Sequence, residues 1–455
     1  MGSSDKTPIK LAVLGHVDSG KSTVAGQMMY QWNAVDEATM EELENDAANS
    51  GWESSEYAWI FDKRQDERAS GDTIDVTLGE FETDDHVVTL IDCPGHNEYT
   101  KNMINGTVGA DCALLVVSAA EGEFEEGLRG QMREHARLAF YLGIRRVIVA
   151  ITKMDSCDWS EDRYNEIVTE TKRILSKQGF NAEKTPYVPI SGLTGDNIST
   201  AIDSPWYNGW PSTSNGVTSY PGKSLLDAIK YFPPPARRLN ASFRLPIRKV
   251  YNIPNVGTIV TGTVIAGRCR PGMTVRLSPG GSVAQVQSIQ QFHKQVKECN
   301  AGDIVGLNLG DLSDDIDVRR CAVVSEVKDS AAICDSFTAH ILVLDRALKS
   351  GCAPSVHCGT GHAPCKFEIT DVLDSRTGKS LNQKEKIARP GLAALVKVTP
   401  LKHLCAERYQ DYQALGRIIV RDSGRTIAVG TVEAVDKTTD IAKARDRHFR
   451  RNGRP

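Results

Sequence analysis

The segment "GHVDSGKS", residues 15–22, has the residue types and spacing of a phosphate-binding loop. It fits the pattern G-x-x-x-x-G-K-[ST] at every defined position, after an apolar run and before a stretch compatible with a helix. Its glycines let backbone N–H groups wrap around phosphates, Lys21 supplies a cation, and Ser22 offers a hydroxyl to Mg²⁺. The start of a helix there also favours anions. The residues assigned to phosphate binding are Gly15, His16, Val17, Asp18, Ser19, Gly20, Lys21, Ser22 and Thr23.

A second segment, "LIDCPGH" (90–96), reads as an apolar strand that ends in an acid and is followed by a turn. Asp92 is expected to hold Mg²⁺, commonly through water, and the Gly95 amide to meet a γ-phosphate. A lone histidine is usually structural, but His96 directly follows this phosphate-sensing glycine. We therefore interpret His96 as the catalytic residue that orients the attacking water.

A third segment, "SGDTIDV" (70–76), lies between the first two. Thr73 is expected to close its hydroxyl on Mg²⁺ when nucleotide is bound, which is the order–disorder behaviour of a switch. Ser22, Thr73 and Asp92 are thus the predicted metal ligands.

The segment "AITKMDS" (150–156) is placed to read a purine base. Asp155 can accept hydrogen bonds from guanine N1–H and N2–H₂, a donor pair that adenine lacks, and the Lys153 stem can lie against the base. Thr152 stands where Asn is usual, so we expect weaker binding by ~1 kcal/mol with guanine specificity retained. The next apolar run supplies further support for the base from Ser191, Gly192 and Leu193. The sequence therefore predicts a site for GTP and GDP.

These motifs need a sheet to position them. Short apolar runs alternate with helix-compatible stretches at 130–143 and 161–179, which predicts an α/β P-loop GTPase domain with a mostly parallel sheet and helices on both faces. Ligands bind at the carboxyl ends of strands in such sheets. The expected strands are residues 9–15, 86–92, 112–120, 145–152 and 187–191.

The predicted GTP-binding domain spans residues 1–235 and ends in three consecutive prolines, a stiff spacer. Beyond it, short β-rich runs with Gly and Pro turns predict two all-β barrel domains, at 241–330 and 333–440. The tail, residues 441–455, is basic and is expected to be disordered.

The net charge of −4 hides a division: residues 1–240 have a balance of −15 and residues 241–455 a balance of +11. This division indicates either an anionic partner for the second half or two solvated surfaces of opposite sign. No apolar run is long enough to cross a membrane, and the N-terminus lacks a signal core. Eleven scattered cysteines are typical of a reducing compartment. We expect a cytoplasmic monomer.

The segment "SVHCGTGHAPC" (355–365) brings Cys358, His362 and Cys365 close together in sequence. It lacks a CxxC pair, and the density of His and Cys alone is a weak indication of zinc. We interpret these three as structural residues.

With its nucleotide motifs in this order, the sequence resembles the translational GTPases, and most closely the elongation factor 1-alpha family. The resemblance covers about residues 8–437 and includes "EYAWIFDK", "DCPGHNEYTKNMINGTVGADCALLVV", "PISGLTGDN" and "LGRIIVRDSGRTIAVGTV". It implies a GTPase domain with two β-barrels. It also implies an activity, the GTP-dependent delivery of aminoacyl-tRNA to the ribosomal A site, and three partners: aminoacyl-tRNA, the ribosome and a guanine-nucleotide exchange factor.

Three departures from the family pattern affect the expected site. The first is Thr152. The second is Asp72, which replaces an Ile that, in the family, forms part of a hydrophobic gate around the catalytic histidine. An acid beside His96 should favour imidazolium and open the hydrophobic gate to water. The third is "QQFHK" (290–294), where the family usually has Glu-Met-His-His-Glu and forms the aminoacyl pocket. Phe292 and His293 either contact the 3′ end of the tRNA or merely cap a barrel loop.

Two other classes of protein share parts of this pattern. A release- or rescue-factor GTPase has the same three-domain body and carries a protein partner. Such relatives usually add a long N-terminal extension, whereas here the first expected strand begins within about ten residues of the start, which favours elongation. A non-hydrolysing scaffold is favoured only by Thr152 and Asp72. The intact Lys21, Thr73 and His96 indicate a working GTPase.

Overall fold

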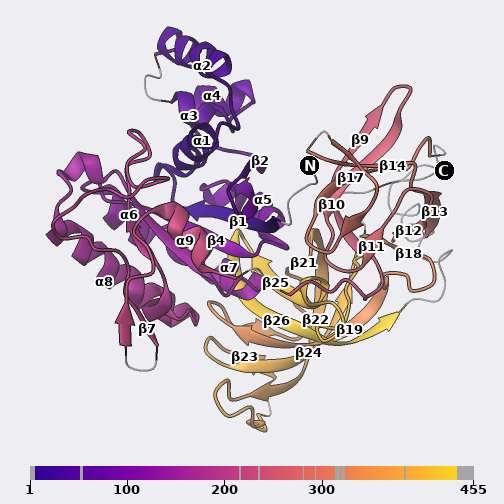
Figure 1. Cartoon of the computed structure of the whole chain (residues 1–455). Helices are drawn as coiled ribbons and strands as arrows, with labels where there is room; N and C mark the ends of the chain where they lie inside the picture. The colour runs from indigo at the N-terminus through magenta and orange to yellow at the C-terminus, as the bar shows by residue number, and fades with distance from the viewer. Residues whose placement is uncertain are drawn as a thin grey trace. The chain divides into compact units, whose positions relative to one another are not determined.

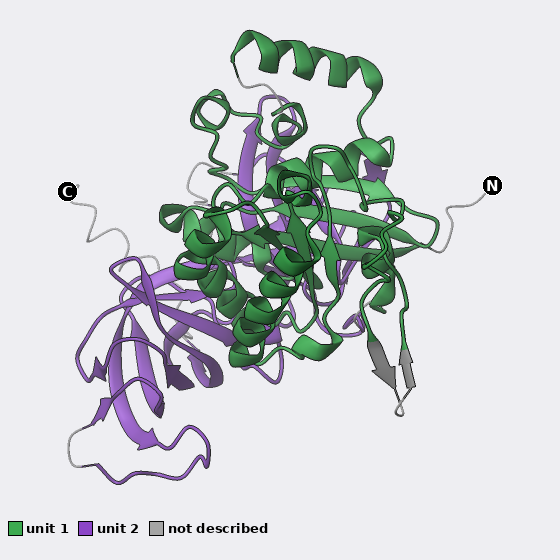
Figure 2. Ribbon diagram, turned by 90° about the vertical axis from the view of Figure 1, so that its left-hand side faces the viewer, with its two compact units in different colours: residues 1–235 green, residues 236–455 purple. Residues whose placement is uncertain are grey.

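The computed structural model describes residues 6–51, 55–214, 217–233, 236–279, 281–292, 294–312, 318, 323–383 and 386–437. His293 and the predicted tail 441–455 lie outside the described residues, so the expectations for them stay predictions. The chain forms two compact units, residues 1–235 and residues 236–455 (Figure 2).

A six-stranded sheet forms the centre of the first unit, in the order β2-β3-β1-β4-β5-β6. All neighbours pair in parallel except β2 with β3, which are antiparallel. The register places Val13 opposite Asp92 and Ser118 opposite Thr152, so the carboxyl ends of four strands meet at one edge. The strands are β1 Thr7–Gly15, β2 Thr77–Glu82, β3 His86–Asp92, β4 Cys112–Ser118, β5 Val147–Thr152 and β6 Tyr187–Pro189.

Helices surround this sheet, and α2, α3 and α4 gather beside α1 (Figure 1). Their own small core consists of Met40, Leu43 and Ala47 of α2 packed on Trp59. The sequence patterns did not predict this helical insertion. The helices are α1 Lys21–Gln31, α2 Glu37–Asn49, α3 Glu56–Trp59, α4 Gln65–Ser70, α5 Thr100–Thr107, α6 Glu123–Arg129, α7 Gln131–Leu142, α8 Glu161–Gln178 and α9 Leu225–Tyr231. The short 3₁₀ helices are η1 Asn97–Tyr99, η2 Met154–Cys157 and η3 Ala182–Lys184, and a hairpin joins β7 Ser212–Ser214 to β8 Val217–Ser219.

The helix boundaries follow from local chemistry. Ser160 caps α8 by accepting a hydrogen bond from the Arg163 amide, and Gly143 ends α7 in the left-handed conformation. Gly26 of α1 faces the Tyr57 carbonyl so closely that any side chain would collide with it. In the described part of the chain, no helix combines the length and the apolar character that crossing a membrane requires.

The first part of the second unit is an eight-stranded sheet in the order β13-β12-β18-β9-β10-β17-β14-β15. A separate antiparallel pair, β11 with β16, lies beside it. Apolar side chains such as Phe243, Val260 and Leu307 form the core of this part. The strands are β9 Arg244–Ile253, β10 Gly257–Thr263, β11 Arg268–Cys269, β12 Thr274–Ser278, β13 Ser282–Gln285, β14 Ser288–Gln291, β15 Lys294–Val296, β16 Cys299–Asn300, β17 Ile304–Asn308 and β18 Val323–Glu326.

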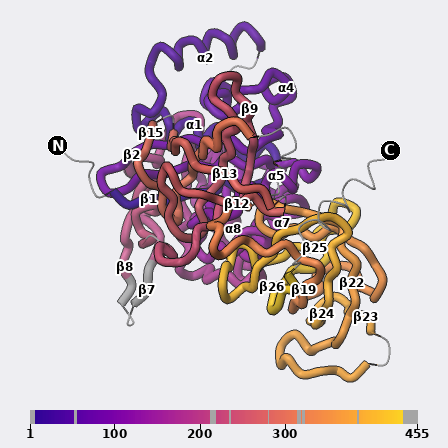
Figure 3. Tube along the Cα trace, turned by 90° about the vertical axis from the view of Figure 1, so that its right-hand side faces the viewer, coloured from indigo at the N-terminus to yellow at the C-terminus, as the bar shows by residue number. Residues whose placement is uncertain are grey.

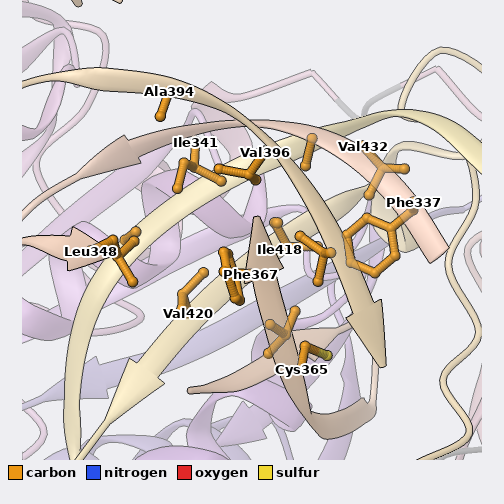
Figure 4. Close-up of a cluster of buried hydrophobic side chains, with 14 of the residues drawn as sticks. Phe337, Ile341, Leu348, Cys365, Phe367, Ala394, Val396, Ile418, Val420 and Val432 are labelled. Carbon is orange, nitrogen blue, oxygen red and sulfur yellow. The ribbon is translucent and has the colours of Figure 1, made fainter. Parts of the chain in front are cut away.

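The second part is a closed barrel in the order β19-β24-β22-β21-β25-β26, whose strands lie together in Figure 3. Phe337, Phe367 and Val396 lie in its core (Figure 4), and Cys358 and Cys365 are buried in the same core. The remaining elements are β19 Cys334–Val343, β20 Leu348–Lys349, β21 Ser355–Cys358, β22 Gly361–Leu373, β23 Ile387–Ala388, β24 Ala393–Pro400, α10 Gln413–Gly416, β25 Arg417–Asp422 and β26 Arg425–Lys437. The predicted fold class, an α/β GTPase domain followed by β-rich domains, is confirmed.

A buried arginine joins the two β parts of the second unit. Arg244, the first residue of β9, is fully buried and binds Asp329 Oδ2 at 3.1 Å and Glu407 Oε1 at 3.4 Å. Its guanidinium lies 4.3 Å from the ring centroid of Tyr412. Burial raises the pKa of Glu407, and the Arg244 charge opposes that rise. Because Glu407 also accepts from the Ala332 amide at 3.1 Å, this network ties both parts together.

Candidate nucleotide-binding site

A pocket of about 400 Å³ opens beside the carboxyl ends of the central strands. It gathers residues from the phosphate-binding loop, the Thr73 segment, the turn after β3 and the loop after β5, which are far apart in sequence. The lining residues are Val17, Asp18, Gly20, Lys21, Ser22, Thr23, Ser55, Ala58, Trp59, Asp62, Gly71, Asp72, Thr73, Gly95, Glu123 and Lys153.

The phosphate-binding loop turns between β1 and α1, and Gly20 takes a left-handed φ of 82° immediately before the helix. Lys21 is buried, and its Nζ donates to the His16 carbonyl at 2.5 Å. Burial lowers the pKa of Lys21, so an anion in the pocket would stabilise the charged ammonium. A Cβ on Gly95 would lie 2.5 Å from this Nζ. Position 95 therefore has to be glycine for the lysine to occupy this place.

Oxygen atoms converge behind Lys21. Ser22 Oγ lies 2.9 Å from Thr73 Oγ1 and donates to Asp92 Oδ2 at 2.7 Å. Thr73 Oγ1 in turn donates to Asp62 Oδ1 at 3.0 Å. Burial raises the pKa of Asp92 to about 6 and that of Asp62 to about 7. The other carboxylate oxygen of Asp92 is buried without a hydrogen-bond partner.

The three residues predicted as metal ligands thus lie together, and the structure adds Asp62 to them. Asp62 lies between α3 and α4, within the segment "EYAWIFDK" that carries part of the family resemblance, but it was not predicted as a ligand. By itself, an acid after an apolar stretch is too common a pattern to indicate a metal site. A set of hydroxyl and carboxylate oxygens is the chemistry that Mg²⁺ prefers.

Thr152 links the base-reading loop to the phosphate-binding loop. Its side chain is buried, and its hydroxyl donates to the Ser19 carbonyl at 2.8 Å. Although its side chain is shorter than that of the usual Asn, Thr152 thus connects the two loops through a direct hydrogen bond.

Lys153 takes the left-handed conformation, with φ 57°, and its ammonium binds both oxygens of Glu123, at 2.9 and 2.7 Å. Ser118 Oγ donates to the same carboxylate at 2.7 Å. Glu123 begins α6 and was not singled out from the sequence, because its contacts come from the ends of β4 and β5. This carboxylate holds the Lys153 stem at the side of the pocket.

The remaining base-side residues occupy two loops. Asp155 is exposed on η2, two residues beyond Lys153. Ser191 is buried and accepts a hydrogen bond from the Thr194 amide at 3.2 Å, whereas the side chain of Leu193 is 44% exposed. A Cβ on Gly192 would lie 3.1 Å from Val24 of α1. These loops leave Asp155 accessible to a ligand from solvent.

His96 directly precedes η1 and is half-buried. Its Nδ1 accepts a hydrogen bond from the Glu98 amide at 3.3 Å, and its ring centroid is 5.9 Å from that of Tyr99. Burial, with a smaller contribution from the Lys21 charge, lowers the pKa of His16 in the phosphate-binding loop. Asp72 lines the pocket, where its charge raises the pKa of Lys21 against the larger effect of burial. Its expected effect on the gate beside His96 stays a prediction.

A buried carboxylate shapes the segment that carries Thr73. Glu67 of α4 accepts hydrogen bonds at one oxygen from the amides of Ile74 and Asp75, at 2.9 and 3.0 Å. Its other oxygen accepts from the Arg64 amide at 3.4 Å, at the start of the same helix. Because Glu67 is only 2% exposed, these bonds are shielded from water.

Comparison with known proteins gives the same domain pattern along the chain. Three family models match it: the elongation factor Tu GTP binding domain at residues 6–235, elongation factor Tu domain 2 at 257–325, and the GTP-eEF1A C-terminal domain-like model at 336–433. Among solved structures, the Ski7 GTPase-like domain of S. cerevisiae is 16% identical, with a TM-score of 0.77, over 94% of this chain and 97% of that one. At this identity the likeness concerns the fold.

Relatives with much higher identity match almost the whole chain. Elongation factor 1-alpha of Aspergillus oryzae is 45% identical over 446 residues, which are 96% of each protein. The protein of the same name from Coccidioides immitis is 46% identical over the same shares. The release- or rescue-factor alternative is not favoured by these relatives. The chain belongs to the elongation factor 1-alpha family, and it is a guanine-nucleotide-binding GTPase of translation elongation.

Proposed function

We propose that this protein delivers aminoacyl-tRNA to the ribosomal A site as a complex with GTP and Mg²⁺, and that His96 acts in the hydrolysis that releases the tRNA. The observation that carries the proposal is one pocket lined by Lys21, Ser22, Thr73 and Lys153, in which the Ser22 hydroxyl also binds the buried Asp92. Family membership supports the cargo. We further propose a cytoplasmic, monomeric protein whose GDP is released with an exchange factor.

The oxygen cluster fits Mg²⁺. Asp92 has a buried oxygen without a hydrogen-bond partner. Its other oxygen accepts from the Ser22 hydroxyl, which lies next to the Thr73 hydroxyl. Ser22, Thr73 and Asp92 would hold the ion, and Asp62 would add negative charge beside it. When bound, Mg²⁺ supplies positive charge to the β- and γ-phosphate oxygens.

The protein's own residues perform the remaining tasks. Gly15 to Thr23 wrap the phosphates with backbone amides, and Lys21 neutralises charge on them. Gly95 senses the γ-phosphate, and Thr73 couples that phosphate to the switch segment. Thr152, Lys153 and Asp155, with Ser191, Gly192 and Leu193, hold the guanine. His96 orients water for attack on the γ-phosphate.

We place the tRNA on the basic second unit, where phosphate contacts supply affinity through counterion release. Phe292, at the turn between β14 and β15 with φ 43°, is our candidate for contact with the 3′ end, together with His293. A strained φ at a bulky aromatic residue is uncommon and accompanies functional sites, which supports this choice over a simple loop cap.

Protection of the aminoacyl ester tests the proposed cargo. The ester of an aminoacyl-tRNA should hydrolyse more slowly with the GTP-bound protein than with the GDP-bound protein, and protection should fall at higher salt. Ester half-life at two salt concentrations, with each nucleotide, measures this. Equal half-lives with and without protein would exclude tRNA carriage and return the release- or rescue-type partner to consideration.

Changes at Thr152 test the bond between the two loops. Thr152→Val keeps the shape but leaves the Ser19 carbonyl without its donor, so GDP should bind roughly tenfold more weakly, as for a buried hydrogen bond of ~1.4 kcal/mol. Thr152→Asn should bind GDP more tightly than the parent. Thr171→Val, which removes a buried hydroxyl of α8, is the matched control. Weaker GDP binding by Thr152→Asn in calorimetry would mean that the loop has been rebuilt around threonine.

Base selection is tested at Asp155. Asp155→Asn should lose affinity for guanine nucleotides and gain it for xanthine nucleotides, which carry an acceptor where guanine has its amino group. Competition binding with GDP, XDP and ADP measures the preference. Asp158→Asn, an exposed position in the same loop, should leave the preference unchanged. A parent protein that binds ADP as well as GDP would contradict the assignment.

A further inference from the structure

Two cysteines face each other across the short antiparallel pair β11–β16. Cys269 pairs with Cys299 in register, and Arg268 pairs with Asn300. The Ala301 amide donates to the Gly267 carbonyl at 2.9 Å, which continues the ladder and fixes this register. Both cysteines are free thiols in the structure.

The geometry of this pair matches what a disulfide requires. Directly opposite residues project to the same face of an antiparallel pair, with Cα atoms about 4.5–5.5 Å apart. A disulfide spans about 4.4–6.8 Å between Cα atoms. The strands would therefore not have to separate or shift for the two sulfur atoms to bond.

The two thiols affect each other's ionisation. The neighbouring Cys299 thiol lowers the pKa of Cys269, whose Sγ donates to the Arg270 carbonyl at 3.8 Å. The Cys269 thiol, together with burial, raises the pKa of Cys299. Cys269 is thus the better nucleophile of the two, because the thiolate is the reactive form.

Burial alone does not distinguish this pair from other thiols, because Cys112 and Cys365 are buried as well. Cys269 and Cys299 are 1% and 0% exposed, within the apolar core of the first β part. Cys157 and Cys352 are more exposed. An oxidant in solution therefore meets those two first, so selective oxidation of the buried pair would have to come from its geometry.

We propose that Cys269 and Cys299 form an oxidation site, which a hydroperoxide converts into a reversible intramolecular disulfide. The Cys269 thiolate attacks one peroxide oxygen and breaks the O–O bond, giving a sulfenic acid and, after protonation, a water molecule. The Cys299 sulfur then displaces the sulfenic hydroxyl as a second water and forms the S–S bond. Two thiols lose two electrons and two protons, and one hydrogen peroxide is reduced to two waters.

The position of the bond gives it a structural consequence. It would close the chain between residues 269 and 299, which contains β12, β13, β14 and β15. The segment that contains these four strands of the eight-stranded sheet would then be closed at its base by a covalent bond, in addition to the short hydrogen-bonded pair. A cross-link of this kind restricts local opening of the segment it encloses.

Mass spectrometry of the whole protein tests the site. The protein is treated with hydrogen peroxide, its remaining thiols are blocked with N-ethylmaleimide in denaturant, and it is digested without reductant. We expect a linked species of peptides 269–276 and 298–319, lighter than their sum by two hydrogen atoms and abolished by dithiothreitol. Recovery of both peptides as maleimide adducts, while Cys157 or Cys352 is oxidised, overturns the proposal.

Variants add a second test. Cys299→Ala should abolish the linked species, whereas Cys112→Ala, which removes a buried thiol of β4 in the other unit, should leave it intact. A Cys269 peptide that becomes linked to another cysteine in Cys299→Ala would show that contact with Cys299 does not determine the site. The parent measurement stands even where a variant fails to fold.

Discussion

The His96→Ala variant should hydrolyse GTP at least ~10²-fold more slowly on the ribosome while binding GDP and GTP almost as tightly as the parent. His96 is not among the residues that line the phosphate pocket, so its removal takes no contact from bound nucleotide. It lies one residue beyond Gly95, which approaches Lys21 closely and is expected to meet the γ-phosphate. The loss should therefore appear in the rate of hydrolysis.

The hydrogen-bond partner of the ring defines how it would act. Nδ1 accepts from the Glu98 amide, so the proton of the neutral imidazole is assigned to Nε2. Such a ring orients a water by donating to its oxygen. Single-turnover hydrolysis with ribosomes, beside nucleotide affinity without them, separates the two effects. The control is His86→Ala, at the start of β3. Hydrolysis by His96→Ala at the parent rate would remove this residue from the mechanism.

The Arg244→Ala variant should lower the free energy of unfolding of the second unit by about 3–5 kcal/mol. The substitution removes the cation from its buried pair with Glu407 and leaves that carboxylate without its charge partner. Burial already raises the pKa of Glu407, and loss of the arginine would raise it further. The variant should thus be less destabilised at low pH, where Glu407 takes up a proton in the folded state.

Urea unfolding of the parent and variants measures this effect. Arg408→Ala removes an exposed ion pair with Asp411 and should cost well under ~1 kcal/mol, so it controls for loss of an arginine as such. A double change, Arg244→Met with Glu407→Leu, should recover much of the stability, because it removes both charges together. A loss below ~1 kcal/mol for Arg244→Ala would mean that water or another group satisfies Glu407.

The parts of the site that could be predicted from the sequence are those with a local pattern. The phosphate-binding loop has a fixed spacing between two glycines and Lys21, and Asp92 ends an apolar run. Parallel strands bring such ends together by geometry alone, and the register of β1, β3 and β4 does so here. Ser22 consequently lies within hydrogen-bonding distance of both of the other predicted metal ligands, Thr73 and Asp92.

Other residues escaped prediction because their partners are distant in sequence. Asp62 contacts Thr73, which lies beyond α4 in the sequence, and Glu123 contacts Lys153 thirty residues away. In the sequence, Arg244 resembles any other arginine at the end of a strand, because its partner Glu407 lies 163 residues further along the chain. The acidic residue at each of these places has no periodicity or motif of its own. Tertiary contact creates its role.

The buried Glu67 has a mechanical consequence for the switch. One side chain holds both the first turn of α4 and the two amides that follow Thr73. Thr73 therefore cannot withdraw from the oxygen cluster alone: either Glu67 gives up two charge-assisted bonds in a water-poor place, or α4 travels with it. If the Thr73 segment opens as predicted, we expect these bonds to make the opening cooperative, with a kinetic barrier, instead of gradual.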